Sequence, residues 1–248
     1  MINLISVRSF SSDAPAQVLV RALPSAFSPM GDRSHNLWFA DMLTFNWNKA
    51  LGIANKLGAG EISVEKWADD FYETLIQTNA NANWIGRDLI TFDATKFEAM
   101  DILKGRGLAD IDAEYLAGFI EDLEDGRYTN EDGSLNMNRI KNRMRLYLGK
   151  ARGVTAQASI DGLPPETEIY WRLGSNEKHC GECPTLASIS PFLPDDLFTT
   201  PGAGETPCLG NCKCHLEFKL DEGSLYERTV TTPYPVNLML DEEDISNL

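Results

Sequence analysis

The chain has 248 residues, of which 43% are hydrophobic and 9% aromatic, so it can bury a substantial core. Its net charge of −15 argues against a general nucleic-acid binder and against binding to anionic lipid, because both need a basic surface. No apolar run approaches the roughly 18 residues of a membrane span, and residues 1–10 lack the apolar stretch of a secretory signal. We therefore expect the chain to be made and used in a cytoplasm, where paired cysteines indicate metal or redox chemistry rather than disulfides.

The first 36 residues show no clear periodicity and are rich in serine and proline. The tail from Pro233 to Leu248 is similar and contains the acidic run 241–244. Segments of this kind are often unstructured, but they also frequently become ordered against a neighbouring subunit. Both ends of the chain are therefore predicted to be extended arms.

The middle of the chain is predicted to be helical. It contains no proline between residues 30 and 163, whereas nine of the 12 prolines lie after residue 163. Apolar residues recur there at helical spacing, and Gly58 and Gly126 follow two of these stretches as C-terminal caps. The expected helices are Leu37–Leu57, one that begins after the N-cap Ser63, one from about Asp112 to Gly126, one from about Asn136 to Arg152, and a short one around Ala94–Leu103.

The helix expected near Asn136–Arg152 carries six of the 22 basic residues of the chain within 14 positions. Such a pattern is most often the solvated face of an amphipathic helix. The alternative is a contact surface for an acidic protein neighbour or for nucleic acid, and the acidic remainder of the chain favours a protein. The candidate partner-binding residues are Arg139, Arg143, Arg145 and Lys150.

All five cysteines fall within 35 residues near the C-terminal end. Cys180 and Cys183 form a C-x-x-C pair, and Cys208, Cys212 and Cys214 follow after a loop rich in proline and glycine. A C-x-x-C pair at a tight turn can bring two thiolates to one metal ion, and a second cluster can complete a tetrahedron. A metal ion also suits a loop-rich segment that cannot build much of a core by itself. We therefore predict one structural zinc ion.

The ligand set is open at this point. The preferred ligands are Cys180, Cys183, Cys208 and Cys212, with Cys214 as the main contender and with His179 and His215 as possible substitutes for a thiolate. Disulfides with one thiol left over, a thioredoxin-like redox pair, and a cluster without metal are the alternatives. A redox pair lacks the βαβ pattern that usually surrounds it, and a catalytic zinc is not expected because no H-E-x-x-H occurs.

Strand-like segments surround the cysteines at 168–173, 214–220 and 226–231, the second with the alternation of a half-buried strand. The predicted fold class is thus mainly α with a small C-terminal α+β or β module stapled by a cysteine cluster, and with extended N- and C-terminal arms. The expected segments are an N-terminal arm over 1–36, a helical domain over 37–163, a cysteine-rich, zinc-ribbon-like module over 164–232, and an acidic tail over 233–248.

Nucleotide-binding and hydrolase motifs are absent from the sequence. No Walker loop, G-x-S-x-G or G-x-G-x-x-G occurs, and the many carboxylates single out no catalytic pair. The sequence therefore favours a protein without enzymatic activity.

Several runs of the cysteine-rich segment together form a recognisable pattern. They are Trp171-Arg172-Leu173, Glu177-Lys178-His179-Cys180-Gly181-Glu182-Cys183, Thr200-Pro201-Gly202 and Pro207-Cys208-Leu209-Gly210-Asn211-Cys212-Lys213-Cys214-His215-Leu216. This pattern resembles the C-terminal module of tailed-phage head-morphogenesis proteins, the Mu F-like minor head proteins. Members of that group commonly show a W-x-L strand, a C-x-x-C and, after a proline-rich loop, an N-C-R-C element followed by a strand. Here Lys213 replaces the arginine, and Cys208 lies near the place of a histidine that often precedes this element.

The resemblance covers about a fifth of the chain, residues 168–218. It implies a minor structural protein of a phage particle that acts in head assembly or at the connection between head and tail, near the portal vertex. Its partners would be portal, capsid or connector proteins and further copies of itself, without membrane or nucleic acid. Such a protein is assembled in the host cytoplasm and resides in the virion. The alternatives are a zinc-ribbon-like nucleic-acid binder that uses the helix around Arg143, and an enzyme delivered with the particle.

Overall fold

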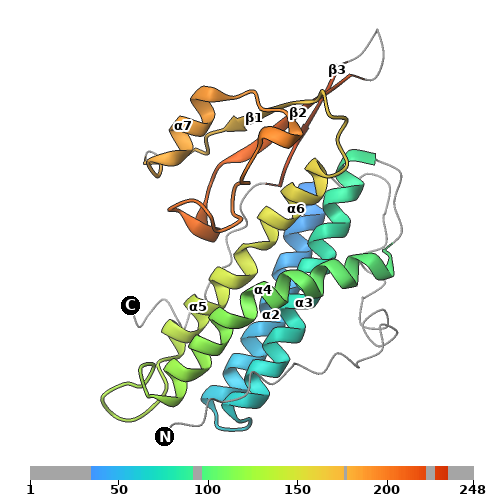
Figure 1. Cartoon of the computed structure of the whole chain (residues 1–248). Helices are drawn as coiled ribbons and strands as arrows, with labels where there is room; N and C mark the ends of the chain where they lie inside the picture. The colour runs from blue at the N-terminus through green and yellow to red at the C-terminus, as the bar shows by residue number, and fades with distance from the viewer. Residues whose placement is uncertain (1–34, 92–96, 176–177, 222–226, 234–248) are drawn as a thin grey trace, which may run out of the picture.

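A computed structural model describes residues 35–91, 97–175, 178–221 and 227–233 of the chain. The predicted fold class is confirmed, because long helices dominate and a small antiparallel sheet with the cysteine cluster follows them (Figure 1). The predicted arms lie outside the described residues, apart from a few residues next to the body. Of these, His35 and Asn36 belong to the first described helix rather than to an arm.

The helical body is built around one central helix. Helix α3 packs against α2, α4, α5 and α6, and Figure 1 shows α5 and α6 following one another along the bundle toward the sheet. Within the described ranges, no helix combines the length and the apolar character needed to cross a membrane. The helices are α2 (His35–Gly58), α3 (Val64–Thr91), α4 (Ala99–Glu124), α5 (Met137–Gly149) and α6 (Ala151–Ile160).

Aromatic side chains hold α3, α4 and α5 together. The ring of Trp67 meets the ring of Phe119 edge-on at 5.1 Å between centroids, and the ring of Phe71 meets that of Tyr147 at 5.9 Å. Trp67, Phe71 and Phe119 are completely buried. Large aromatic groups contribute much of the apolar area that a core of this size removes from water. The inward positions predicted from helical spacing are thus the core positions of the body.

Helix α4 is one continuous helix where the sequence indicates two. Gly105 and Gly107 weaken the helical pattern between Leu103 and Asp112, which is why the sequence alone suggests a break there. In the structure, Gly105 lies where α4 crosses α3, and an added Cβ would lie 2.6 Å from the carbonyl oxygen of Ile76. Close packing of the two helices therefore overrides the low helix propensity of glycine.

The start of α4 is fixed to α3 by a buried carboxylate. Asp101 accepts hydrogen bonds from Asn83 Nδ2 at 2.7 Å, from Arg87 Nη2 at 2.7 Å and from the backbone N–H of Glu98 at 2.8 Å. A buried carboxylate is tolerated when it is paired and hydrogen-bonded in this way. The network explains why α3 extends to Thr91 through an asparagine-rich stretch with little apolar periodicity.

The fourth predicted helix is divided in the structure. Helix α5 ends at Gly149, Lys150 separates the two helices with a right-handed helical backbone conformation, and α6 continues to Ile160, eight residues beyond the predicted end. The sequence Arg152-Gly153 is typical of a helix end, because glycine commonly follows a last turn that contains a basic residue. Here Gly153 instead lies inside α6, where an added Cβ would lie 2.5 Å from Cα of Ala203.

The C-terminal sheet has three antiparallel strands in the order β1-β2-β3, and the three predicted strands are confirmed to within a residue or two, although Tyr226 lies outside the described residues. Trp171 lies opposite Leu216, and Phe218 lies opposite both Ile169 and Val230. Helix α7, which the sequence did not indicate, packs against β1. The elements are β1 (Glu168–Arg172), α7 (Glu182–Ile189), the 3-10 turns η2 (Pro194–Asp196) and η3 (Leu209–Asn211), β2 (His215–Asp221) and β3 (Glu227–Thr231).

The buried face of the sheet continues into the helical body. Trp171 and Leu216 belong to the same apolar cluster as Leu89 of α3 and as Ala156 and Ile160 of α6. The cysteine-rich segment therefore shares a core with the ends of these two helices and does not depend on its own residues alone.

The crossing of α3 and α4 gives a first testable prediction. We expect Gly105→Ala to lower the free energy of unfolding by roughly 1–3 kcal/mol, because the added methyl group must displace the backbone of α3. Gly107→Ala is the matched control, since a Cβ added there would meet nothing within 4 Å and alanine raises helix propensity by roughly 0.5–1 kcal/mol. Urea unfolding of both variants measures the difference. Equal stability of the two would contradict the close crossing.

Candidate metal centre

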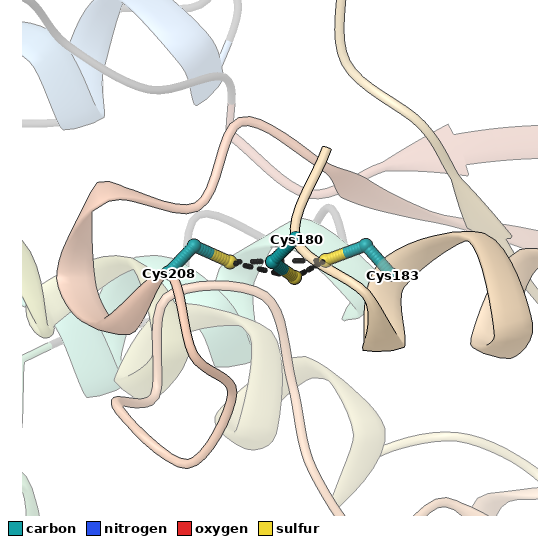
Figure 2. Close-up of side chains that lie close together, drawn as sticks. All are labelled: Cys180, Cys183 and Cys208. Atoms are coloured by element: carbon teal, nitrogen blue, oxygen red, sulfur yellow. Dashed lines mark hydrogen bonds between the residues drawn. The ribbon is translucent and has the colours of Figure 1, made fainter. Parts of the chain in front are cut away.

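The five cysteines come from two turns that face each other. Cys180 precedes α7 and Cys183 lies in its first turn. Cys208 precedes η3, Cys212 follows it, and Cys214 precedes β2. Figure 2 shows the sulfur atoms of Cys180, Cys183 and Cys208 pointing toward one another, with Cys183 coming from α7 and Cys208 from the other turn. All five are free thiols, so no disulfide holds these turns together.

The sulfur atoms form two trios, each with all three atoms within 4.8 Å of one another. Cys183 lies 3.1 Å from Cys180, 3.8 Å from Cys208 and 3.8 Å from Cys212, and Cys208 lies 3.4 Å from Cys180. Four thiolates at about 2.3 Å from one tetrahedral ion would lie about 3.8 Å apart. Two of the four distances match this value and two are shorter, and each trio is compact enough to bind one ion. The trios are Cys180, Cys183 and Cys208, and Cys183, Cys212 and Cys214.

The cluster is a mostly closed site that could hold a metal ion. Cys183, Cys212 and Cys214 are buried, and Cys180 and Cys208 are partly buried. Cys183 belongs to both trios and so occupies the centre of the arrangement. His179 and His215, the possible substitutes, do not join any trio of ligand atoms among the described residues. The thiols alone thus offer more ligands than a tetrahedral ion requires.

The protonation of the thiols is strongly interdependent. Burial, followed by the hydrogen bond to Cys180, raises the pKa of Cys183. The interaction with Cys214, followed by burial, raises the pKa of Cys212, and the hydrogen bond from the Cys212 thiol lowers the pKa of Cys214 to about 5. Buried thiolates close to one another disfavour further ionisation. A bound cation would remove this constraint, because metal ligands are thiolates and binding releases their protons.

Backbone geometry positions the second turn. Leu209 has a positive φ of 49°, which an L-residue adopts at some cost, and this conformation starts the turn that separates Cys208 from Cys212. Gly174, after β1, packs so closely that an added Cβ would lie 2.3 Å from the carbonyl oxygen of Lys213. A side chain at position 174 would therefore displace the residue between Cys212 and Cys214.

Arg152 of α6 is a site residue that the sequence analysis missed. Its guanidinium is buried and donates hydrogen bonds from Nη1 to the carbonyl oxygen of Cys212 and from Nη2 to that of Cys214. In the sequence it is the last member of the basic stretch, and no local signal separates it from the solvated residues. Its role depends on the contact of α6 with the second cysteine turn, which only the folded structure reveals.

The basic residues of α5 contact several groups of the same chain. Arg143 donates to Asp122 at 2.6 Å and to the hydroxyl of Tyr128 at 3.0 Å, and its guanidinium lies over the ring of Phe119. The hydrogen bond from Arg143 lowers the pKa of the Asp122 carboxyl. Lys150 pairs with Asp112. Much of the positive charge predicted to meet a partner is thus already neutralised within the chain.

The two remaining candidates of the partner-binding set differ in exposure. Arg139 is exposed, donates to the carbonyl oxygen of Arg127 at 2.8 Å and lies over the ring of Tyr128. Arg145 is partly buried. Contact of these residues with another protein stays a prediction.

Comparisons of the chain with protein-family models, with curated proteins and with the solved structures found no match. The functional interpretation therefore rests on the geometry of the cysteine cluster and on the pattern of residues around it.

The shared position of Cys183 gives a second testable prediction. We expect Cys183→Ser to weaken binding of a thiophilic ion, because both trios lose a member. The loss should exceed the roughly 10- to 100-fold that is typical when a group that only hydrogen-bonds to a metal ligand is removed. Cadmium titration of the reduced protein, followed by the near-ultraviolet absorption of cadmium–thiolate bonds, measures this. Cys214→Ser is the matched control and should bind more tightly than Cys183→Ser, since it leaves the trio of Cys180, Cys183 and Cys208 intact. Undiminished binding by Cys183→Ser would contradict the assigned centre.

Proposed function

We propose that the cysteine cluster is a structural zinc site, with Cys180, Cys183 and Cys208 as ligands and with Cys212 or Cys214 as the fourth. The observation that supports this most is the convergence of the sulfur atoms, since the distances from Cys183 to Cys208 and to Cys212 match the spacing around a tetrahedral ion. Thiolate-rich tetrahedral sites are typical of zinc, and a site with four protein ligands has no open position for a reacting water. The proposed role of the ion is therefore to hold the fold.

The ion would join two parts of the chain that are separated in the sequence. One is the turn before α7, and the other is the loop from Cys208 to Cys214 that leads into β2. A loop-rich segment of this size has only a small core of its own. Metal binding can supply folding free energy in such a segment, because the unfolded chain has no preformed site.

A direct measurement of metal content tests the zinc site. Protein purified without chelator should contain about one zinc ion per chain, since a tetrahedral site uses four of the five thiols. Four thiols should react with a thiol reagent only after chelation, and the fifth should react earlier or after unfolding. Elemental analysis and a thiol count on the same sample provide these numbers. No zinc together with five reactive thiols in the folded protein would contradict the proposal.

We further propose that the chain is a structural minor protein of a tailed-phage particle, which acts in head assembly or at the portal and head–tail connection. The support is the resemblance of residues 168–218 to the Mu F-like minor head proteins. The segments that carry this resemblance are neighbours in the fold, since Trp171 of the W-x-L strand lies opposite Leu216 of the strand after the second cysteine turn. The matching segments thus belong to one folded unit. A resemblance of this kind is more specific than several short matches that lie apart in the fold.

The outer face of α4 offers a surface for a neighbouring virion protein. Met100, Leu103 and Ile111 are between 58% and 69% exposed, and at 100° per residue they fall within about 80° around the helix. Several large apolar side chains exposed on one face often mark a contact with another protein. The proposed partners are portal, capsid or connector proteins, or further copies of this chain.

Reconstitution of particles tests this second proposal. We expect the chain in purified particles at a fixed copy number, and we expect Ile111→Lys to reduce its incorporation, because a charge would have to be buried at the contact. Ala117→Lys is the matched control, since this exposed residue lies about 120° from Ile111 around α4. Quantitative protein analysis of the particles gives the copy number.

Complete absence of the wild-type chain from particles would contradict the virion role. Equal incorporation of Ile111→Lys and wild type would contradict the contact through α4 and leave the virion role intact.

A further inference from the structure

Arg152 lies where the helical body meets the cysteine cluster. Its side chain is almost fully enclosed, with 4% of the residue exposed, and its guanidinium joins the carbonyl oxygens of Cys212 and Cys214. Burial of a cation is costly unless charge and hydrogen bonds compensate for it. Among the described residues Arg152 forms no ion pair with a carboxylate, unlike Arg87, Arg143 and Arg172. Among these residues the guanidinium is compensated only by two carbonyl oxygens, so negative charge in the adjacent cysteine cluster would stabilise it further.

The position of Arg152 is fixed by packing on both sides. The next residue, Gly153, lies against Ala203, with no room for a Cβ, and its carbonyl oxygen accepts a hydrogen bond from Thr200 Oγ1 at 3.2 Å. Thr200 and Ala203 belong to the loop that leads to Cys208. Helix α6 and this loop thus hold the guanidinium against the second cysteine turn.

A divalent ion with four thiolates has a net charge of −2, and a buried guanidinium beside it offsets part of that charge. Interactions between charges are stronger in a buried site than in water, so this compensation is largest where Arg152 lies. Arg152 has no carboxylate partner among the described residues, and the metal–thiolate group would carry excess negative charge. Each would therefore compensate for the charge of the other.

We propose that Arg152 is a positioning residue of the metal centre, which orients Cys212 and Cys214 through their carbonyl oxygens and offsets the charge of the metal–thiolate group. This inference rests on the proposed zinc site. Groups that contact metal ligands in this way typically change metal affinity by roughly 10- to 100-fold when they are removed. The coupling is reciprocal: the bound ion stabilises the contact of α6 with the second cysteine turn, and loss of the ion leaves the arginine buried without compensation.

The test compares zinc affinity in three variants, measured by competition with a chromophoric chelator. Arg152→Met should raise the Kd for zinc by roughly 10- to 100-fold, because both the hydrogen bonds and the charge are lost. Arg152→Lys should raise it by less, since an ammonium keeps the charge but does not match the planar fork that joins two carbonyl oxygens. Lys56→Met is the control for loss of one positive charge at an exposed site, and its Kd should equal that of the wild type.

A second readout separates positioning from a general effect on folding. Cobalt bound to Arg152→Met should give a visible spectrum different from that of the wild type, because the geometry of the second cysteine turn changes. The rise in unfolding temperature on addition of zinc should also be smaller than for the wild type. A variant that only weakens the helical body would unfold earlier with and without metal, but would keep the wild-type cobalt spectrum and Kd, and this result would overturn the inference.

The outcomes distinguish the two proposals. A wild-type chain that binds neither zinc nor cobalt overturns the proposed metal site itself. A wild-type chain that binds zinc, with an unchanged Kd in Arg152→Met, overturns only the role of Arg152. If Arg152→Met does not fold, Arg152→Lys decides: an unchanged Kd and cobalt spectrum overturn the positioning role, and a weaker affinity with an altered spectrum supports it.

Discussion

The convergence of five thiols on one small volume is the constraint on which the C-terminal part of the structure depends. Neutral thiols contribute only weak hydrogen bonds, and several buried thiolates repel one another. A cation of suitable size relieves both problems, because it replaces weak contacts by metal–sulfur bonds and removes the excess negative charge. The two cysteine turns, the short helix α7 and the start of β2 all meet at this cluster, and apolar residues of the sheet belong to the same buried core.

The helical body takes part in the same arrangement. Helix α6 follows α5 toward the sheet (Figure 1), and this places Arg152 and Gly153 against the loop and the second cysteine turn. Leu89, Ala156 and Ile160 extend the apolar core across the junction. Packing, hydrogen bonding and charge thus connect the two parts at one place. A change in the cysteine cluster is therefore expected to affect α6. The aromatic core around Trp67 lies in a separate apolar cluster.

The sequence predicts those features that depend on local spacing. Helical periodicity located the core faces of the bundle, alternation located the strands, and the C-x-x-C spacing located the candidate metal centre. Features set by contacts between distant segments could not be predicted. Gly105 indicates a helix break in the sequence, but in the structure it allows α4 to pack closely against α3. Arg152 resembles its solvated neighbours in the sequence, but in the structure it contacts the second cysteine turn. For the same reason Asp101, one carboxylate among many in the sequence, gave no sign of its buried role.

The distribution of charge also constrains how this chain can meet a neighbour. Arg143 and Lys150 are paired with carboxylates of the same chain, and Arg152 is buried, so the basic stretch offers less free positive charge than its composition suggests. Two copies with net charge −15 repel each other, and an apolar contact or a basic partner between them can offset this repulsion. The exposed apolar side chains of α4 satisfy the first condition without opposite charges. An assembly built from this chain is therefore expected to use that face for close contacts, and to leave its acidic surface toward solvent or toward a basic neighbour.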